Sequence, residues 1–391
     1  MRKILSLVLC IGLILGLGVY SFAIDETKKE AEYDFEGVPE IDVNVKSAVL
    51  MEADTGKILY AKNEREEASP ASVTKIMTLL LVMEAIGESR IELSDEVVIS
   101  DYAASMGGSQ VFLEEGERFS VEELIKCTVI ASANDAAVAL AELVSGSEEA
   151  FVSQMNKRAS ELGMVNTSFE NVTGLDDTTK NHYTSANDIA IMSRELLKHE
   201  LVLKYSSMWQ DTIRGGEFTL TNTNRLVRYY DGCNGLKTGS TDKAGFCISA
   251  TAKRGGMQLI AVIMGAQTRD ERNTAARTLL DFGFSNFGIF KYENKVYDNV
   301  KLVGGVKEET SAYSDGFSAL VLKKDVKRVE VVYDIPDGFC APMKKDEKIG
   351  KIIFKVDGRV VGSCDVFASE NVEKITFFGV FKKIMRNIFL G

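Results

Sequence analysis

The chain passes from a β-hairpin into a helical region at Ser69-Pro70-Ala71-Ser72-Val73-Thr74-Lys75. Residues three apart share one face of a helix, so the Lys75 amine can reach the Ser72 hydroxyl. The helix N-terminus stabilises negative charge on the serine, and burial or cationic neighbours favour a neutral lysine. A neutral lysine can replace histidine as a general base. The stretch therefore predicts Ser72 as a nucleophile that Lys75 activates.

The Ser-x-x-Lys spacing is weak evidence by itself, because average composition yields it about once or twice in a chain of this length. It occurs again at Ser240-Thr241-Asp242-Lys243. Two further motifs follow in order, Ser132-Ala133-Asn134 in a break between helices and Lys237-Thr238-Gly239 on a strand. A second Ser-x-Asn, Ser185-Ala186-Asn187, is interpreted as a helix cap. The order and context of the three motifs make the prediction specific.

Strand patterns lie at both ends of the region that carries the motifs. A hairpin is expected at 47–51 and 58–60, and antiparallel strands at 235–238, 246–250 and 258–264. Between them the pattern from Ser72 to about Gly146 is helical, with a capping box at Ser120-Val121-Glu122-Glu123. A last helix is expected over 269–282. This order predicts an α+β domain whose sheet joins N-terminal and C-terminal strands, with helices packed on it.

Changes of composition predict five segments in the 391-residue chain. An apolar run after Arg2 and Lys3, with small residues at its exit, is typical of a secretory signal, although an uncleaved N-terminal anchor is an alternative. The body is therefore expected outside the cytoplasm. The predicted segments are a signal at 1–23, an acidic linker at 24–45, a catalytic domain at 46–288, a small all-β domain at 289–370 and a terminal helix at 371–391.

The terminal segment, residues 371–391, is a basic amphipathic helix in an otherwise acidic chain. The alternative interpretations are a membrane-surface anchor, which we favour, and a helix packed on the protein's own core. One face of the helical wheel is apolar and the other is basic or polar. The apolar positions are Phe377, Phe378, Phe381, Ile384, Met385, Ile388 and Phe389, and the polar positions are Lys382, Lys383, Arg386 and Asn387.

Composition argues against several classes of function. The net charge of −11 argues against a nucleic-acid partner, which needs a basic face. The five cysteines after residue 23 are not spaced like metal ligands, and the chain has only two histidines. No metal or other cofactor is therefore expected. His182 is interpreted as structural more readily than as a base, and Trp209, the single tryptophan, as packing.

With these motifs the chain resembles the D-alanyl-D-alanine carboxypeptidases, the low-molecular-weight penicillin-binding proteins. Further similar segments are Met155-Asn156, Leu162-Gly163-Met164, Gly174-Leu175-Asp176 and Ala244-Gly245. The resemblance covers about residues 45–290, and the β-rich tail and terminal helix also match the family's usual layout. It implies a β-lactamase/transpeptidase-like domain whose substrate is a peptidoglycan stem peptide ending in D-Ala-D-Ala.

The resemblance also implies a role for each motif residue. Ser72 would form the acyl-enzyme with Lys75 as its base, while Ser132 and Asn134 would relay protons and hold the substrate amide. Lys237 and Thr238 would bind the terminal carboxylate, which β-lactam inhibitors imitate. Backbone N–H groups of Ser72 and Ser240 would form the oxyanion hole. Gly239 is expected to keep the strand edge open for the substrate backbone.

Two other classes remain open at this stage. A β-lactamase would share the fold and motifs, but no convincing Glu-x-x-Leu-Asn segment is found, and the middle motif is Ser-Ala-Asn. A non-catalytic penicillin sensor would usually carry transmembrane helices and an intracellular partner domain, and none is expected here beyond the signal. An inert relative should have lost a motif residue, and all are present. Transpeptidation uses the same acyl-enzyme with another acceptor. The expected location is the outer face of the cytoplasmic membrane, with peripheral attachment.

Overall fold

The computed structural model describes residues 33–177, 179–336 and 338–390. The predicted signal at 1–23 and the first part of the predicted linker lie outside the described residues. Contacts divide the described chain into two units. The first contains Phe35–Lys295 and Asp315–Val329, and the second contains Val296–Ser314 and Glu330–Gly391.

The first unit is built on a five-stranded antiparallel sheet of order β2-β1-β9-β8-β7. Its strands are β1 (Ser47–Glu52), β2 (Ile58–Lys62), β7 (Cys233–Thr241), β8 (Gly245–Arg254) and β9 (Met257–Ala266). The central pairing joins β1 to β9 from Ser47↔Met264 to Glu52↔Leu259. The predicted α+β class is therefore confirmed, and so is the pairing of N-terminal with C-terminal strands. Strand β7 lies at the edge of this sheet.

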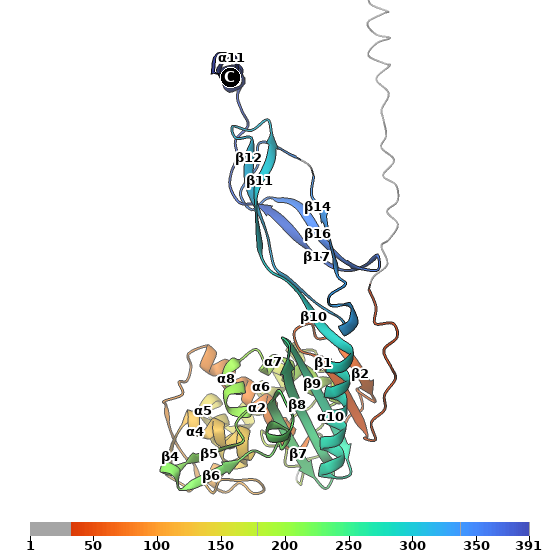
Figure 1. Ribbon diagram of the computed structural model, residues 1–391. Coiled ribbons are helices and arrows are strands. Elements are labelled where there is room, and N and C mark those ends of the chain that lie inside the picture. Colours follow the sequence, from red (N-terminus) through yellow and green to blue (C-terminus); the bar gives the residue numbers. More distant parts are fainter. Residues whose placement is uncertain (1–32, 178, 337, 391) are drawn as a thin grey trace, which may run out of the picture. The chain divides into compact units, whose positions relative to one another are not determined.

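Helices cover the sheet (Figure 1). The long helix α10 (Arg269–Asn286) packs on β8 and β9, and α7 (Ala186–Leu196) also packs on the sheet and contacts α2 (Lys75–Gly87). Helix α2 is apolar on almost every side and is buried from its first residue through Met83. A helix that is apolar all round belongs in a core, so α2 carries Lys75 directly into the interior.

The first unit contains further helices, several of which contact α2. Helix α4 (Val121–Lys126) begins with the predicted capping box and leads into the π-helical turn η2 (Cys127–Ala131). The others are α3 (Asp101–Ala104), α5 (Asn134–Ser145), α6 (Glu148–Glu161), α8 (Glu200–Ser206) and α9 (Leu226–Tyr229). The expectation of helix throughout 72–146 is wrong, since β3 (Glu96–Val98) pairs with β4 (Arg118–Ser120). Turns and β-prone pairs interrupt the helical period there.

Two short pairs of strands complete the first unit. Strands β5 (Gln210–Ile213) and β6 (Phe218–Thr221) form a hairpin around the 3-10 turn η3 (Arg214–Gly216). Strand β10 (Phe287–Tyr292) pairs with β13 (Phe317–Leu322), which leads into the turn η4 (Lys323–Asp325).

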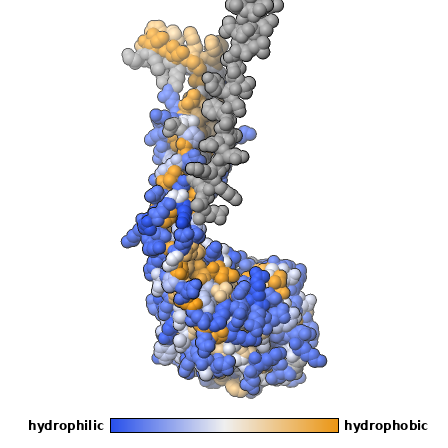
Figure 2. Space-filling model, turned by 90° about the vertical axis from the view of Figure 1, so that its right-hand side faces the viewer, coloured by the Kyte–Doolittle hydropathy of each residue, from blue (hydrophilic) through white to orange (hydrophobic). Residues whose placement is uncertain are grey.

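The second unit is all-β apart from its terminal helix, as predicted. A six-stranded sheet has the order β14-β16-β17-β12-β11-β15. These strands are β11 (Lys295–Val303), β12 (Glu309–Ser314), β14 (Glu330–Asp334), β15 (Phe339–Cys340), β16 (Lys348–Val356) and β17 (Arg359–Ala368). Helix α11 (Phe377–Leu390) follows, and Figure 2 shows hydrophobic surface gathered on it. Among the described residues, we find no helix with the length and hydropathy needed to cross a membrane.

Candidate active site

Ser72 lies in a 3-10 turn, η1 (Ala71–Thr74), immediately before α2 begins at Lys75. The prediction that Ser72 itself opens the α-helix is therefore one turn early. Ala71 has a φ of +48°, a left-handed conformation that is uncommon for a residue with a side chain. Gly174 packs against this turn so closely that a Cβ there would lie 1.8 Å from the Ala71 carbonyl oxygen. The serine turn is thus packed directly against the backbone at Gly174.

The Lys75 amine sits among three oxygen atoms. Its Nζ lies 3.0 Å from Ser72 Oγ, 2.6 Å from Asn134 Oδ1 and 2.9 Å from the Thr173 carbonyl oxygen. The side chain is fully buried. Burial, and then the positive charge of Lys237, lower the pKa of Lys75 well below its usual range. The surroundings of Lys75 therefore favour the neutral amine next to the serine hydroxyl.

Ser132 is placed by an irregular helix end. The α4 helix widens into the π-helical turn η2, and Ser132 then adopts a left-handed conformation with φ of +64°. This break turns its hydroxyl toward Lys237, whose Nζ donates a hydrogen bond to Ser132 Oγ over 2.8 Å. Lys237 is 1% exposed, so its ammonium lies behind Ser132 and not in open solvent. Burial, and next the charge of Arg272, lower the pKa of Lys237 to about 7.

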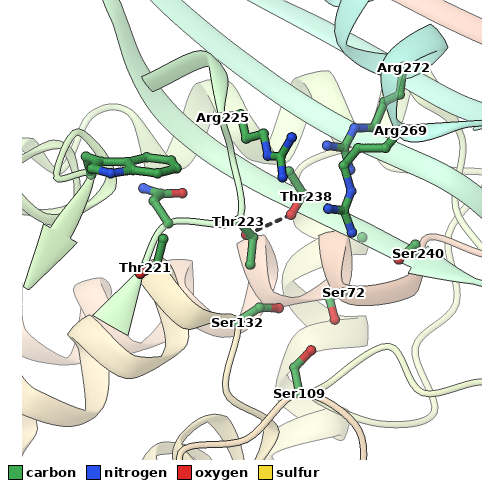
Figure 3. Close-up of a pocket in the computed structure, with 13 residues that line it drawn as sticks. Ser72, Ser109, Ser132, Thr221, Thr223, Arg225, Thr238, Ser240, Arg269 and Arg272 are labelled. Atoms are coloured by element: carbon green, nitrogen blue, oxygen red, sulfur yellow. Dashed lines mark hydrogen bonds between the residues drawn. The ribbon is translucent and has the colours of Figure 1, made fainter. Parts of the chain in front are cut away.

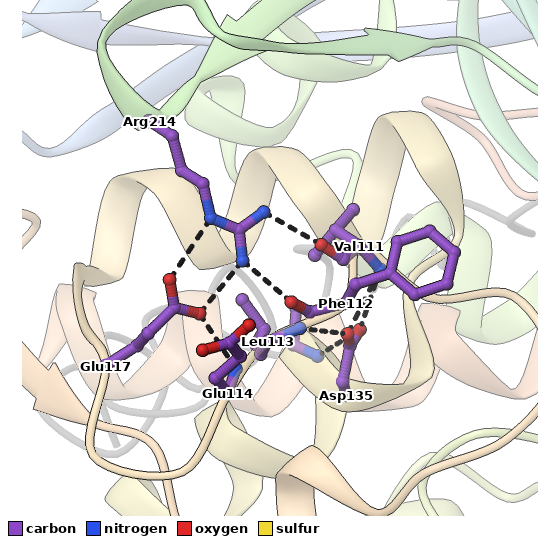
Figure 4. Close-up of polar contacts among 8 residues, drawn as sticks. Val111, Phe112, Leu113, Glu114, Glu117, Asp135 and Arg214 are labelled. Carbon is purple, nitrogen blue, oxygen red and sulfur yellow. Dashed lines mark hydrogen bonds and ion pairs between the residues drawn. The ribbon is translucent and has the colours of Figure 1, made fainter.

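A loop at residues 107–113 holds the second motif in place. The Asn134 side-chain amide donates to the Gly107 carbonyl oxygen over 2.6 Å, which leaves Oδ1 directed at Lys75. The next residue, Asp135, is fully buried and accepts hydrogen bonds from the backbone N–H groups of Val111 and Leu113. From the β5–β6 hairpin, Arg214 donates to two backbone carbonyls of this loop and pairs with a neighbouring carboxylate (Figure 4). The loop is therefore held by Asp135 through its backbone N–H groups and by Arg214 through its backbone carbonyls.

The third motif lies on β7, where it passes the serine turn. A Cβ on Gly239 would lie 2.8 Å from the Ser72 backbone nitrogen and 2.9 Å from the Pro70 carbonyl oxygen. Gly239 is therefore required for close contact between β7 and the serine turn, in addition to any space that it leaves for a substrate backbone at the strand edge. Asp176 ties the two together as well, since it accepts hydrogen bonds from Ser69 Oγ and Thr241 Oγ1.

These elements enclose a cleft of about 410 Å³. Figure 3 shows Ser72, Ser109 and Ser132 on one side of it and Thr238 and Ser240 on the other. The lining residues are Ser72, Ser109, Ser132, Trp209, Thr221, Asn222, Thr223, Arg225, Thr238, Gly239, Ser240, Arg269 and Arg272. The structure thus brings together all three predicted motifs, with Lys75 and Lys237 behind the surface of the cleft.

Sequence reasoning missed several lining residues, namely Ser109, Thr221, Asn222, Thr223, Arg225, Arg269 and Arg272. They lie outside the motifs, in loops and at the start of α10. The interpretation of Trp209 as packing alone is wrong, because it also lines the cleft while Arg228 packs over its ring. The polar run Thr221-Asn222-Thr223-Asn224-Arg225 was the available signal, since such runs seldom serve a core.

His182 is structural, as expected. Its Nδ1 accepts a hydrogen bond from the Glu170 backbone N–H, so its Nε2 carries the proton and donates to Thr74 Oγ1 over 2.8 Å. Burial lowers the pKa of His182 to about 4, which keeps the ring neutral. Among the described residues, no group of acidic, histidine or cysteine side chains is arranged to hold a metal ion.

Fold and site together are those of a serine acyl-transferring enzyme. Residues 33–268 match the family model described as D-alanyl-D-alanine carboxypeptidase, and residues 284–374 match that of the penicillin-binding protein 5 C-terminal domain. The chain therefore belongs to the D-alanyl-D-alanine carboxypeptidase family. The family, fold class and enzyme class predicted from the motifs, a serine-type D-Ala-D-Ala carboxypeptidase, are confirmed.

Individual relatives are similar to this chain in sequence or in structure over 63% to 98% of its length. The chain is 43% identical over 393 residues to D-alanyl-D-alanine carboxypeptidase DacF of Bacillus subtilis, covering 98% of both chains. Penicillin-binding protein 5 from Haemophilus influenzae is similar in structure, with a TM-score of 0.72, 31% identity, and coverage of 86% of this chain and 100% of that one. Penicillin-binding protein D2 from Listeria monocytogenes, in an ampicillin-bound form, gives a TM-score of 0.58 at 30% identity, over 63% and 99% of the two chains.

Proposed function

We propose that Ser72 removes the terminal D-alanine from peptidoglycan stem peptides through an acyl-enzyme. One observation carries the assignment of roles. A neutral amine has two N–H hydrogens and one lone pair, and Lys75 Nζ has three oxygen neighbours. When it donates to Asn134 Oδ1 and the Thr173 carbonyl oxygen, its lone pair is left for the Ser72 hydroxyl. Lys75 is then positioned to accept the Ser72 proton as Oγ attacks the substrate carbonyl.

The leaving D-alanine needs a proton on its nitrogen. Ser132 lies between the cleft and Lys237, whose pKa of about 7 allows it to exist with or without its extra proton at neutral pH. We assign the protonation of the leaving amine to Ser132 Oγ, which is replenished from Lys237 Nζ. Water then attacks the Ser72 ester and releases the shortened stem peptide.

Substrate alignment falls to the edge of β7 and the loop opposite. Asn134 is proposed to hold the substrate amide, while Thr238, with Lys237 behind it, receives the terminal residue. The backbone N–H groups of Ser72 and Ser240 are proposed as the oxyanion hole, and removal of one such donor typically costs about 3 kcal/mol in the transition state. The close approach that Gly239 permits supports this pairing, because it brings β7 alongside the Ser72 nitrogen.

β-Lactams carry a carboxylate next to a reactive amide, so the same groups should receive them. We propose that they acylate Ser72. The ampicillin-bound form of the Listeria relative supports this proposal for the present chain.

Attachment to a membrane surface is a proposal that α11 supports. Phe377 and Phe378 are each 82% exposed, and Phe381, Ile384, Ile388 and Phe389 are exposed as well. Burying such a face in the headgroup region releases apolar surface from water. We accordingly propose an exported enzyme, held peripherally at the outer face of the cytoplasmic membrane by α11, the helix that follows the β-rich strands of the second unit in sequence.

Mass spectrometry of the exported chain after labelling with benzylpenicillin tests the proposal. The expected adduct lies on the peptide that contains Ser72, with release of D-alanine from a diacetylated L-Lys-D-Ala-D-Ala peptide by the unlabelled enzyme. An adduct on another residue would show that Ser72 is not the nucleophile. Rapid turnover of penicillin without release of D-alanine would instead favour a β-lactamase.

A further inference from the structure

The segment 171–176, between α6 and α7, contacts Lys75 from behind the cleft, and none of the described residues that line the cleft comes from it. The Thr173 carbonyl oxygen accepts a hydrogen bond from Lys75 Nζ over 2.9 Å, and the Val172 carbonyl oxygen accepts one from Thr78 Oγ1 over 2.7 Å. Lys75 and Thr78 are three residues apart and lie on one face of α2. Helix α2 is therefore docked on two consecutive carbonyl groups of this segment.

The half-buried side chain of Asn171 closes this segment into a turn. Its Oδ1 accepts hydrogen bonds from the backbone N–H groups of Gly174, over 2.7 Å, and of Thr173, over 3.2 Å. Its Nδ2 donates to the Leu175 carbonyl oxygen over 2.7 Å. Asparagine side chains stabilise turns by bonding nearby backbone groups in this way. Because each end of the amide has partners of the matching kind, these contacts determine its orientation.

A single peptide group joins Asn171 to Lys75. The carbonyl group of Thr173 and the N–H of Gly174 belong to the same trans peptide unit, which is planar and directs these two groups in opposite directions. Asn171 holds the N–H at one end, and Lys75 donates to the oxygen at the other. Rotation of this peptide unit would break both hydrogen bonds. The position of the Thr173 oxygen next to Lys75 therefore depends on Asn171.

The role proposed for Lys75 needs this oxygen. A neutral amine leaves its lone pair for the Ser72 hydroxyl only when both of its N–H groups have acceptors elsewhere. Asn134 Oδ1 is one acceptor, and the Thr173 carbonyl oxygen is the other. If the Thr173 oxygen turned away, the amine would donate to Ser72 Oγ instead. Its lone pair would then point away from the proton that it has to accept.

We infer that Asn171 is a positioning residue for Lys75, acting through the Thr173–Gly174 peptide group, whose N–H it holds and whose oxygen receives one N–H of the lysine amine. Asn171 does not line the cleft, so it acts on the lysine and not on the substrate. The inference rests on the proposed function, in which Lys75 accepts the Ser72 proton. It gives the turn that precedes Asp176 a part in catalysis besides its packing against the serine turn.

The test measures acylation of the full chain by a fluorescent penicillin, by stopped flow, across the acid limb of its pH profile. Asn171→Ala should lower the maximal rate by about 10-fold to 100-fold, because the base loses its alignment with the Ser72 hydroxyl. Asn171→Ser keeps an acceptor oxygen that can hold the turn more weakly, so a loss of only about 3-fold is expected.

The position of the acid limb is the readout that a purely structural role would not move. The protonated amine has three N–H groups and gains more from the Thr173 oxygen than the neutral amine does, so loss of this acceptor lowers the pKa of Lys75. The limb should therefore move to lower pH, by about half a unit to one unit in Asn171→Ala. The charged groups that act on Lys75, Lys237 on β7 and Asp135 on α5, are unchanged in these variants.

Asn156→Ala is the matched control. Asn156 is also a half-buried asparagine, and it bonds the N–H and the carbonyl oxygen of Phe169, two residues before the turn begins. Its loss should lower the melting temperature, as that of Asn171 does, but it should leave the acid limb in place and the rate within about 2-fold. Thermal unfolding of every variant separates loss of fold from loss of position, and Asn171→Ser carries the comparison if Asn171→Ala does not fold.

The outcomes distinguish the inference from the proposed function. Acid limbs of the Asn171 variants that coincide with that of the wild type would overturn the inference, whatever the loss of rate, because a structural role lowers only the active fraction. An equal shift of the limb in Asn156→Ala would overturn it too, since any loosening would then suffice. A wild-type rate of acylation in Lys75→Ala would instead overturn the proposed function.

Discussion

The catalytic centre and the terminal helix α11 depart in opposite ways from the usual distribution of side chains, in which polar groups are exposed and apolar groups are buried. At the centre, Lys75, Lys237 and Asn134 are polar side chains with at most 1% exposure. On α11, Phe377 and Phe378 are apolar side chains with 82% exposure. Burying charge and exposing aromatic rings both cost free energy, so each region needs a compensating role.

The two regions compensate differently. The buried amines find oxygen partners within 3.0 Å, and burial changes their chemistry by lowering their pKa values. Among the described residues, the aromatic face of α11 is exposed, and we propose that a lipid surface covers it. Polar groups inside thus point to catalysis, and apolar groups outside point to a partner. The predictions below test this contrast.

The largest effect is expected from Lys75→Ala. Removal of the base next to Ser72 should lower the rate of acylation by a fluorescent penicillin by about 10³-fold or more. Lys243→Ala is the matched control, because Lys243 has the same spacing from Ser240 but lies exposed on the turn between β7 and β8. Equal losses in both variants would show that the buried environment of Lys75 is not what matters. Thermal unfolding should confirm that each variant folds.

The next effect concerns the exposed face of α11. Replacing Phe377, Phe378 and Phe381 by serine should weaken binding of the full chain to vesicles of phosphatidylglycerol and phosphatidylcholine. If each ring contributes about 1 kcal/mol on partial burial, the partition coefficient falls about 100-fold. Co-sedimentation measures it, with Val303→Ser as a control at an exposed apolar position on β11. Hydrolysis of a soluble peptide should remain unchanged, and a fall in it would contradict a pure anchor role.

A smaller effect is expected in the pH dependence of stability. His182 has a pKa of about 4 when folded against 6.5 when exposed, so unfolded chains bind the extra proton first as pH falls. Its contribution to stability is complete above pH 6.5 and is lost as pH falls toward 4, by about 2 kcal/mol between pH 7 and 4.5. Urea unfolding of wild type and His182→Gln at both values measures it. A variant with the same acid sensitivity as wild type would show that His182 titrates normally.

The smallest predicted effect comes from Arg214→Ala, which releases one side of the loop at residues 107–113 (Figure 4). Asp135 still holds the other side, so Asn134 should lose only part of its positioning. A fall of about 5-fold to 10-fold in kcat/KM is expected, in line with about 1 kcal/mol for such bonds. Arg118→Ala, an exposed residue of β4, is the control. A loss as large as that of Lys75→Ala would mean that the loop collapses altogether.

The main strands, the last helix of the first unit and the three motifs could be predicted from the sequence, because hydrophobic periods and motif spacing are local properties of the chain. The β3–β4 pair inside 72–146 could not. The sequence identified the strand pairing of the first unit and the amphipathic terminal helix, and it identified Ser72-x-x-Lys75 as more than a chance match once Ser132-x-Asn134 and Lys237-Thr238-Gly239 followed. It could not place Arg225 and Arg269, which are 44 residues apart and belong to no motif.

The positions of the charged groups became visible only in three dimensions. The tertiary structure turned Lys237 toward Ser132, brought Gly239 against the Ser72 turn, and gathered the arginines around Thr238. It also showed that Trp209 lines the cleft and that His182 is a buried neutral ring. Burial, pKa and the direction of a side chain depend on neighbours that are distant in sequence. For that reason the spacing of the motifs could predict the candidate nucleophile but not the surroundings that shape its cleft.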